Sequence, residues 1–102
     1  MSPTRLESDF QKKLKLDLYD MFPDCVIIKN NPNRLQGIPD LLILWGPYWA
    51  VLECKRSASD THRPNQDWYV EQWNAMSFAS FIYPENREEV LSALQSAFGV
   101  AR

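Results

Sequence analysis

The chain has few cysteine, histidine and glycine residues and no long apolar run. Among 102 residues there are two cysteines, one histidine and three glycines. A single histidine, and two cysteines that lack ligand spacing, give no support for a zinc site. Both Cys25 and Cys54 fall in apolar, strand-like segments, which favours buried free thiols over a disulfide. No stretch approaches the about 18 apolar residues of a membrane span, and the first residues lack the apolar core of a signal peptide, so we expect a cytoplasmic protein.

A strong excess of positive charge is also missing. The 13 Asp and Glu outnumber the 11 Lys and Arg, for a net charge of −2. This balance argues at first against a nucleic-acid partner. It changes if Glu7, Asp40 and Glu53 bind a metal ion, because only ten acids then remain against 11 basic residues. Bulk charge therefore discriminates weakly between function classes.

The spacing of apolar residues predicts seven elements in one domain that covers residues 1–102. We expect helices over 4–22, 65–76 and 84–98, and strands over 25–28, 41–44, 49–54 and 77–83. The order is α-β-β-β-α-β-α. Three strands in antiparallel succession, followed by a helical crossover to a fourth, predict an α/β fold with a mixed four-stranded sheet and helices on its faces.

Charged residues stand at the ends of two apolar strands. Gly37-Ile38-Pro39-Asp40 precedes one strand, and Glu53-Cys54-Lys55 ends the next. If the hairpin turn centres between Gly46 and Pro47, Asp40 lies directly opposite Glu53, and Lys55 emerges on the same face. A slip of one residue would send the two acids to opposite faces, so the prediction depends on this register.

Two close carboxylates in a partly dry site are costly unless a cation lies between them. Mg²⁺ fits best, because it prefers one or two carboxylates and keeps water ligands for a substrate phosphate. A hydrated Mg²⁺ beside an ammonium group suits phosphodiester hydrolysis. The plainer alternative is a structural salt-bridge cluster at the end of the sheet.

Pro39-Asp40 followed by Glu53-Cys54-Lys55 resembles the signature of the PD-(D/E)xK nucleases. The element order also matches that superfamily, so the resemblance implies a restriction-endonuclease-like fold over nearly the whole chain. Gly37-Ile38-Pro39-Asp40, with Gln66 opening the following helix, is most similar to virus-type replication and repair nuclease domains. Phage endonuclease I-type and archaeal-type Holliday junction resolvases are close in plan.

The resemblance implies roles for individual residues. Asp40 and Glu53 would be metal ligands, with the Cys54 carbonyl as a third, and Lys55 would be the catalytic lysine. Glu7 matches an acid that these families carry on the first helix, although its capping-box spacing from Thr4 gives it a complete structural role as well. Gln66 matches a polar residue that points toward the site, or is simply a polar residue of a first helical turn.

The function that follows is a Mg²⁺-dependent DNA endonuclease, with Mn²⁺ as a substitute, in phage replication, recombination or repair. We expect branched DNA, such as a four-way junction, as the substrate. A site-directed nicking or homing-type endonuclease is the second hypothesis, and a non-cleaving DNA-binding module of the same fold is the third. Basic residues in the loops that flank the acids either contact phosphates or are ordinary solvated charges. They are Lys29, Arg34, Arg56 and Arg63.

Aromatic residues gather at the predicted hairpin tip. Trp45, Tyr48 and Trp49 lie within five residues, where a small monomer has little to bury them against. They would form a dimer interface or stack on bases. We favour a homodimer, because cutting both strands of a duplex or junction needs two sites and one small domain offers one.

Overall fold

The computed structural model describes the backbone of residues 4–100 and the side chains of residues 8–100. Three α-helices, four strands and one short 3₁₀ helix follow the predicted order. They are α1 (Thr4–Met21), β1 (Val26–Lys29), β2 (Leu41–Trp45), β3 (Tyr48–Cys54), α2 (Gln66–Met76), β4 (Phe78–Ile82), η1 (Pro84–Asn86) and α3 (Arg87–Ala97). The predicted boundaries differ by one to three residues, and the start of the last predicted helix is the 3₁₀ turn η1.

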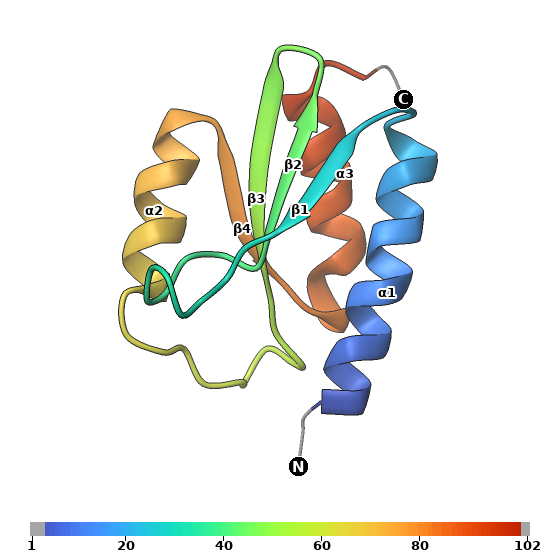
Figure 1. The fold of residues 1–102 in the computed structure, drawn as a ribbon. Helices are drawn as coiled ribbons and strands as arrows, with labels where there is room; N and C mark the ends of the chain where they lie inside the picture. The colour runs from blue at the N-terminus through green and yellow to red at the C-terminus, as the bar shows by residue number, and fades with distance from the viewer. Residues whose placement is uncertain (1–3, 101–102) are drawn as a thin grey trace.

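The four strands form one mixed sheet in the order β1-β2-β3-β4 (Figure 1). β1, β2 and β3 are antiparallel neighbours, and β4 lies parallel to β3 after the α2 crossover. The predicted register of the central hairpin is confirmed, since Leu44 pairs with Trp49 and Leu42 with Val51. Gly46 and Pro47 form the two-residue turn. The mixed α/β architecture is therefore the one that the sequence predicts.

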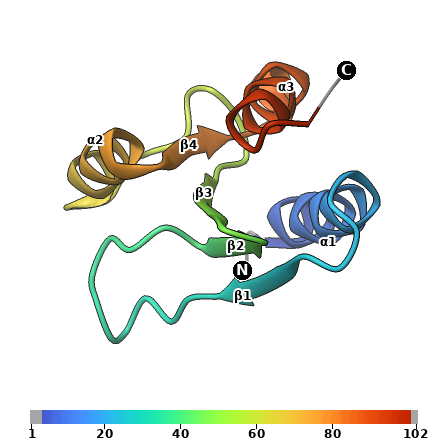
Figure 2. The same ribbon diagram turned by 90° about the horizontal axis from the view of Figure 1, so that it is seen from above.

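The helices lie on both faces of the sheet. α1 and α3 cover one face, and α2 covers part of the other (Figure 2). The face toward α1 and α3 carries the hydrophobic core, because alternate strand residues such as Leu41, Ile43 and Leu52 are fully buried there. The other face of the same strands carries Leu42, Val51 and the residues in register with them.

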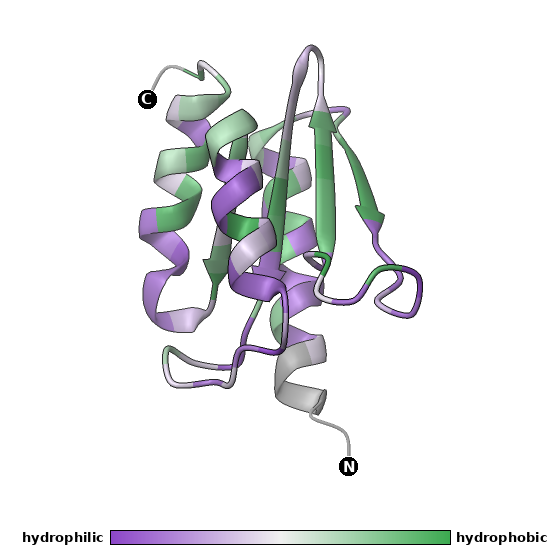
Figure 3. Ribbon diagram, turned by 90° about the vertical axis from the view of Figure 1, so that its left-hand side faces the viewer, coloured by the Kyte–Doolittle hydropathy of each residue, from purple (hydrophilic) through white to green (hydrophobic). Residues whose placement is uncertain are grey.

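On the face of the sheet that α2 covers, the half formed by β1 and β2 stays uncovered. Val26 and Ile28 of β1 and Leu44 of β2 are exposed, although all three are apolar. In Figure 3 the ribbons of β1 and β2 are coloured mainly as hydrophobic and run beside α2. A shallow pocket of about 300 Å³, lined in part by Trp49 and Trp73, lies on this side of the sheet. This uncovered surface is called the open sheet face below.

The aromatic residues of the hairpin tip are covered by the rest of the chain more than the sequence indicated, although Tyr48 stays 40% exposed. Trp45 packs between Phe22 and Phe98, and its indole N–H donates to the Pro23 carbonyl at 2.9 Å. Tyr48 stacks on Phe98. The residue after α1 and the residue after α3 therefore cover one side of the hairpin tip, while a role of its aromatic residues in a dimer or in base stacking stays a prediction.

Within the described residues, no helix combines the length and the apolar character that crossing a membrane requires.

Gly37 holds the loop between β1 and β2 against the segment that leads into α2. Its φ is +88°, and a Cβ atom at this position would lie 2.6 Å from the Pro64 carbonyl oxygen. Gly46 also has a positive φ of +58°, but a Cβ atom there would meet nothing within 4 Å. A side chain at Gly46 would therefore cost only backbone strain, whereas a side chain at Gly37 would also clash with neighbouring atoms.

Gly37→Ala is expected to destabilise the fold more than Gly46→Ala. The Gly46 variant meets only the left-handed backbone cost of roughly 1–2 kcal/mol, whereas the Gly37 variant adds a clash with backbone. Urea unfolding of both variants and of the wild type measures the difference. Equal free energies of unfolding for the two variants would contradict this account of Gly37.

Candidate active site

The two acids meet at one end of the central hairpin. Asp40 directly precedes β2, and Glu53 is the penultimate residue of β3. Because β2 and β3 are antiparallel, the start of one and the end of the other lie at the same edge of the sheet. The Asp40 amide donates a hydrogen bond to Glu53 Oε1 at 3.1 Å, and the Cys54 amide donates one to Asp40 Oδ2 at 3.0 Å. The sequence-predicted pair is therefore in contact.

Lys55 and Gln66 complete the centre of the site. Lys55 Nζ donates to Gln66 Oε1 and to the Thr61 carbonyl, both at 2.7 Å. Gln66 Nε2 in turn donates to Glu53 Oε2 at 2.8 Å. The Gln66 amide thus bridges the lysine and the glutamate, whose charged atoms lie 3.9 Å apart. Gln66 is the first residue of α2, so the first turn of this helix holds Lys55 in place.

Burial makes these contacts necessary. Glu53 is 4% exposed, Lys55 5% and Gln66 7%. A buried charge without partners is strongly destabilising, so the ammonium and the carboxylate need the hydrogen bonds that Gln66 and the Thr61 carbonyl provide. The arrangement also fixes both side chains in single orientations, as catalysis requires.

Asp40 has partners on its other side that the sequence did not reveal. Gln11 of α1 donates from Nε2 toward Asp40 Oδ2 at 3.5 Å, and Lys29 Nζ donates to Gln11 Oε1 at 3.1 Å. One signal was available: Gln11 is a polar residue three positions before Leu14 and seven before Leu18, on the helix face that is buried. A polar side chain on an apolar helix face needs a partner, and Asp40 and Lys29 are the partners.

The pKa of Asp40 is raised above its ordinary value. Burial is the main cause, because a poorly hydrated site disfavours the charged carboxylate. The hydrogen bond from the Cys54 amide and the charges of Lys29, Lys55 and Arg63 act in the opposite direction. The folded chain therefore holds this carboxylate at a cost, and a bound cation would relieve that cost.

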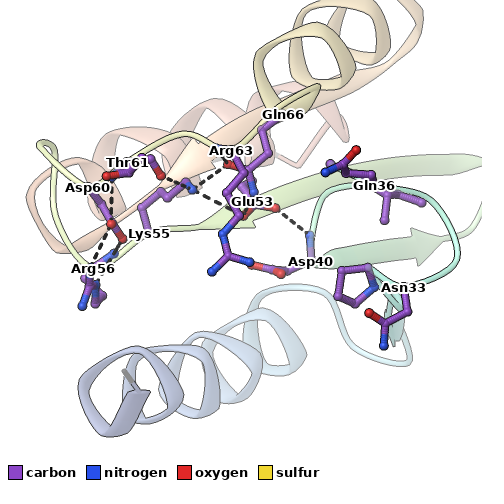
Figure 4. A pocket seen from close by; sticks show the side chains of 13 residues that line it. Asn33, Gln36, Asp40, Glu53, Lys55, Arg56, Asp60, Thr61, Arg63 and Gln66 are labelled. Atoms are coloured by element: carbon purple, nitrogen blue, oxygen red, sulfur yellow. Dashed lines mark hydrogen bonds and ion pairs between the residues drawn. The ribbon is translucent and has the colours of Figure 1, made fainter. Parts of the chain in front are cut away.

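An open pocket of about 700 Å³ surrounds the site. In Figure 4, Asp40, Glu53 and Lys55 lie between Asn33 and Gln36 of the β1–β2 loop on one side and Thr61 on the other. Arg63 lies over the centre of the pocket, beside Glu53. The walls of the pocket come from two loops that meet at Gly37.

The four basic residues proposed for DNA contact are placed differently from one another. Arg63 and Arg56 line the pocket. Arg56 is paired with Asp60 through two guanidinium contacts, and this pairing, with the Arg56 amide, lowers the pKa of Asp60. Lys29 hydrogen-bonds Gln11 beside the pocket, and Arg34 is exposed on the β1–β2 loop.

The loop from Lys55 to α2 is held by further contacts. The His62 ring stacks on Phe81 with centroids 4.1 Å apart, and its Nδ1 lies 2.7 Å from Asp67 Oδ1. Together with the Arg56–Asp60 pair, these contacts fix the loop that carries Thr61 and Arg63. His62 thus serves the loop rather than the pocket.

The donor set suits Mg²⁺ better than a metal with a full protein cage. Among the side chains of residues 8–100, no three His, Cys, Asp or Glu residues gather into a ligand group. Mg²⁺ needs only one or two carboxylates, with water and substrate oxygens as the other ligands. Gln11 and the Cys54 amide both donate to Asp40 Oδ2, so Oδ1 is the oxygen that suits a cation. The side chain of Glu7, a further predicted ligand, lies outside the described residues, and the Cys54 carbonyl stays a predicted ligand.

Comparison of the chain with protein-family models, with curated proteins and with solved structures gave no match. The function of the chain is therefore inferred from the site itself and from the resemblance of its motif.

Asp40→Asn is expected to stabilise the metal-free protein at pH 7. Because burial raises the pKa of Asp40, the ionised carboxylate opposes folding at pH values above that pKa, and a neutral amide removes the penalty. Asp60→Asn should have the opposite sign, since the lowered pKa of Asp60 means that its charge supports the fold until the pH falls through that pKa. Melting temperatures in EDTA, followed by circular dichroism, should shift by a few degrees in opposite directions. A lower melting temperature for Asp40→Asn than for the wild type would refute this reading of the site.

Proposed function

We propose that the chain is a Mg²⁺-dependent DNA endonuclease of the PD-(D/E)xK superfamily with a restriction-endonuclease-like fold. The observation that carries the proposal is the contact of Asp40 with Glu53 across the β2–β3 hairpin, with Lys55 held beside them by Gln66. A structural salt-bridge cluster explains this arrangement less well. Such a cluster gains nothing from an open pocket or from an Asp40 carboxylate whose pKa burial raises.

Asp40 and Glu53 would hold the metal ion, with the Cys54 carbonyl as a further ligand. A Mg²⁺ ion at this place supplies a Lewis acid that polarises the phosphoryl oxygen and acidifies a bound water molecule. The described residues supply the remainder. They fix the two carboxylates by backbone amides and leave room in the pocket for the phosphate and the attacking water.

Lys55 would act on the phosphate directly. Its ammonium group has three N–H donors, and within the described part of the chain Gln66 and the Thr61 carbonyl accept two of them. The same ammonium group forms an ion pair with Glu53 Oε2 at 3.9 Å. Beside a bound phosphate its positive charge would stabilise the negative charge that develops in the transition state. Because Gln66 fixes the amine, little reorganisation is needed during the reaction.

Arg63 and Lys29 would draw the DNA backbone toward the site, with Arg34 on the same loop side and Arg56 at the pocket wall. Phosphate contacts of this kind position a nucleic acid without reading its sequence. The few basic groups suit recognition of DNA shape, so branched DNA such as a four-way junction is the substrate we propose. The setting would be phage replication, recombination or repair in the cytoplasm of a host cell.

The open sheet face would be the contact between two copies of the chain. β1 is an edge strand with the sequence Val26-Ile27-Ile28-Lys29 and has no proline. Its one charge, Lys29, lies at the end of the strand and bonds Gln11 of α1, which leaves the apolar Val26 and Ile28 exposed on the open sheet face. The open sheet face reaches the active site, because Ile38 lines both the apolar pocket and the polar one. A homodimer across this surface would bring together the two active sites that cutting two strands requires.

Glu53→Gln and Lys55→Met are each expected to lower the cleavage rate roughly 100- to 1,000-fold, which is the usual cost of removing a group that stabilises charge in the transition state. Glu53→Gln removes a metal ligand, and Lys55→Met removes the ammonium while keeping the approximate length of the side chain. Supercoiled plasmid, linear duplex and a four-way junction are incubated with each protein, with Mg²⁺, with Mn²⁺ and with EDTA.

Melting curves of the variants provide the control, because loss of activity counts only for a folded protein. Cleavage of the junction by the wild type with Mg²⁺ or Mn²⁺, and not with EDTA, supports the proposal. Full activity of either folded variant would remove the mechanism. Cleavage of one duplex sequence without preference for branches would replace the junction by a site-directed target, and binding without cleavage by the wild type would indicate a non-cleaving module.

Ile28→Asp is expected to convert the proposed dimer to a monomer. Ile28 is 42% exposed at the centre of the β1 edge, where a charge would be buried without a partner in the dimer. Leu16→Asp is the matched control, since Leu16 is 64% exposed on α1, on the opposite side of the sheet. Light scattering after size-exclusion chromatography measures the mass of each. A monomeric wild type at micromolar concentration would show that the open sheet face has another use.

A further inference from the structure

Gln11 is a buried amide that touches both a cation and an acid of the site. It is 7% exposed on α1, close in sequence to the fully buried Leu14. Its Oε1 accepts a hydrogen bond from Lys29 Nζ at 3.1 Å, and its Nε2 lies 3.5 Å from Asp40 Oδ2. Because only the oxygen of the amide can accept from an ammonium, the Lys29 contact fixes the orientation of the amide and turns the N–H₂ group toward Asp40.

The contact selects one oxygen of Asp40. Oδ2 accepts from Gln11 and from the Cys54 amide, which donates at 3.0 Å. Two donors from different elements, α1 and β3, fix the plane of the carboxylate. Oδ2 is thus engaged by two donors, and Asp40 lines the polar pocket.

We propose that Gln11 is a positioning residue that fixes Asp40 for metal binding, a role that rests on the proposed nuclease function. An amide suits this place because it accepts from Lys29 and donates to Asp40 at once. A carboxylate would repel Asp40, and an apolar side chain would leave both neighbours without this partner. Hydrogen bonds of this kind to a ligating carboxylate orient it toward the metal, and their loss typically weakens metal binding about 10- to 100-fold.

The test compares Gln11→Met with Gln72→Met. The first variant keeps the approximate volume of the side chain and removes both hydrogen bonds. The second makes the same change at an exposed position of α2 that does not line the polar pocket. Gln11→Asn is a further variant that keeps the amide but is one methylene too short to span the distance from Lys29 to Asp40.

Mn²⁺ binding is measured by electron paramagnetic resonance without DNA, and the Mg²⁺ concentration for half-maximal cleavage is measured with DNA. We expect Gln11→Met and Gln11→Asn to bind Mn²⁺ roughly 10-fold more weakly than the wild type. The Mg²⁺ requirement should shift in parallel, with most of the cleavage rate restored at saturating metal. Gln72→Met should match the wild type in both measurements.

The outcomes separate this inference from the proposed function. One outcome would overturn the role of Gln11 alone: the two Gln11 variants bind Mn²⁺ as tightly as the wild type. In that case the wild type still binds Mn²⁺ and cleaves DNA, and Glu53→Gln does not cleave. A reduced cleavage rate at saturating metal with unchanged metal affinity would also overturn it, because a residue that acts only through Asp40 must act through metal binding. A wild type that neither binds Mn²⁺ nor cleaves DNA would overturn both proposals.

Discussion

The pairing of β2 with β3 determines everything that the site can do. Side chains alternate between the two faces of a strand, so the register that places Leu42 opposite Val51 also places Asp40 opposite Glu53. Burying two acids and a lysine at the end of an apolar sheet would be strongly unfavourable if these groups were scattered. Because they converge, backbone amides, one glutamine and one carbonyl group can form hydrogen bonds with them. The remaining cost of burial falls on Asp40, whose pKa is raised.

Each side of the site depends on a different layer of the fold. α2 contributes Gln66, which acts on Glu53 and Lys55, and α1 contributes Gln11, which acts on Asp40. The sheet therefore supplies the charged groups, while the two helix layers determine where those groups point. This division explains why a small domain can hold an ordered polar site: the hydrogen bonds come from elements that the hydrophobic core already fixes.

Local signals were sufficient to predict the element order, the hairpin register and the meeting of Asp40 with Glu53. A two-residue turn between apolar strands has few alternatives, and a one-residue slip would have exposed Leu41 and Ile43. Contacts between distant segments were not predictable in the same way. The covering of Trp45 by Phe98 depends on where the chain goes after α3, and the reach of Gln11 to Asp40 depends on how α1 crosses the sheet. The sequence shows that Gln11 is polar on an apolar helix face and that Trp45 is aromatic at a hairpin tip, but it does not reveal which residues they contact.

The crossover between the parallel strands β3 and β4 affects the order in which the site forms during folding. The acids belong to a hairpin that can form by itself within microseconds, as short antiparallel pairs do. Lys55, in contrast, can bond Gln66 only after α2 has docked and β4 has joined the sheet. This step needs contacts between residues far apart in the sequence, so it is the slower one. In a nascent or partly unfolded copy, Lys55 and Glu53 would therefore lack their contacts with Gln66, and the complete site would form last, with the finished tertiary structure.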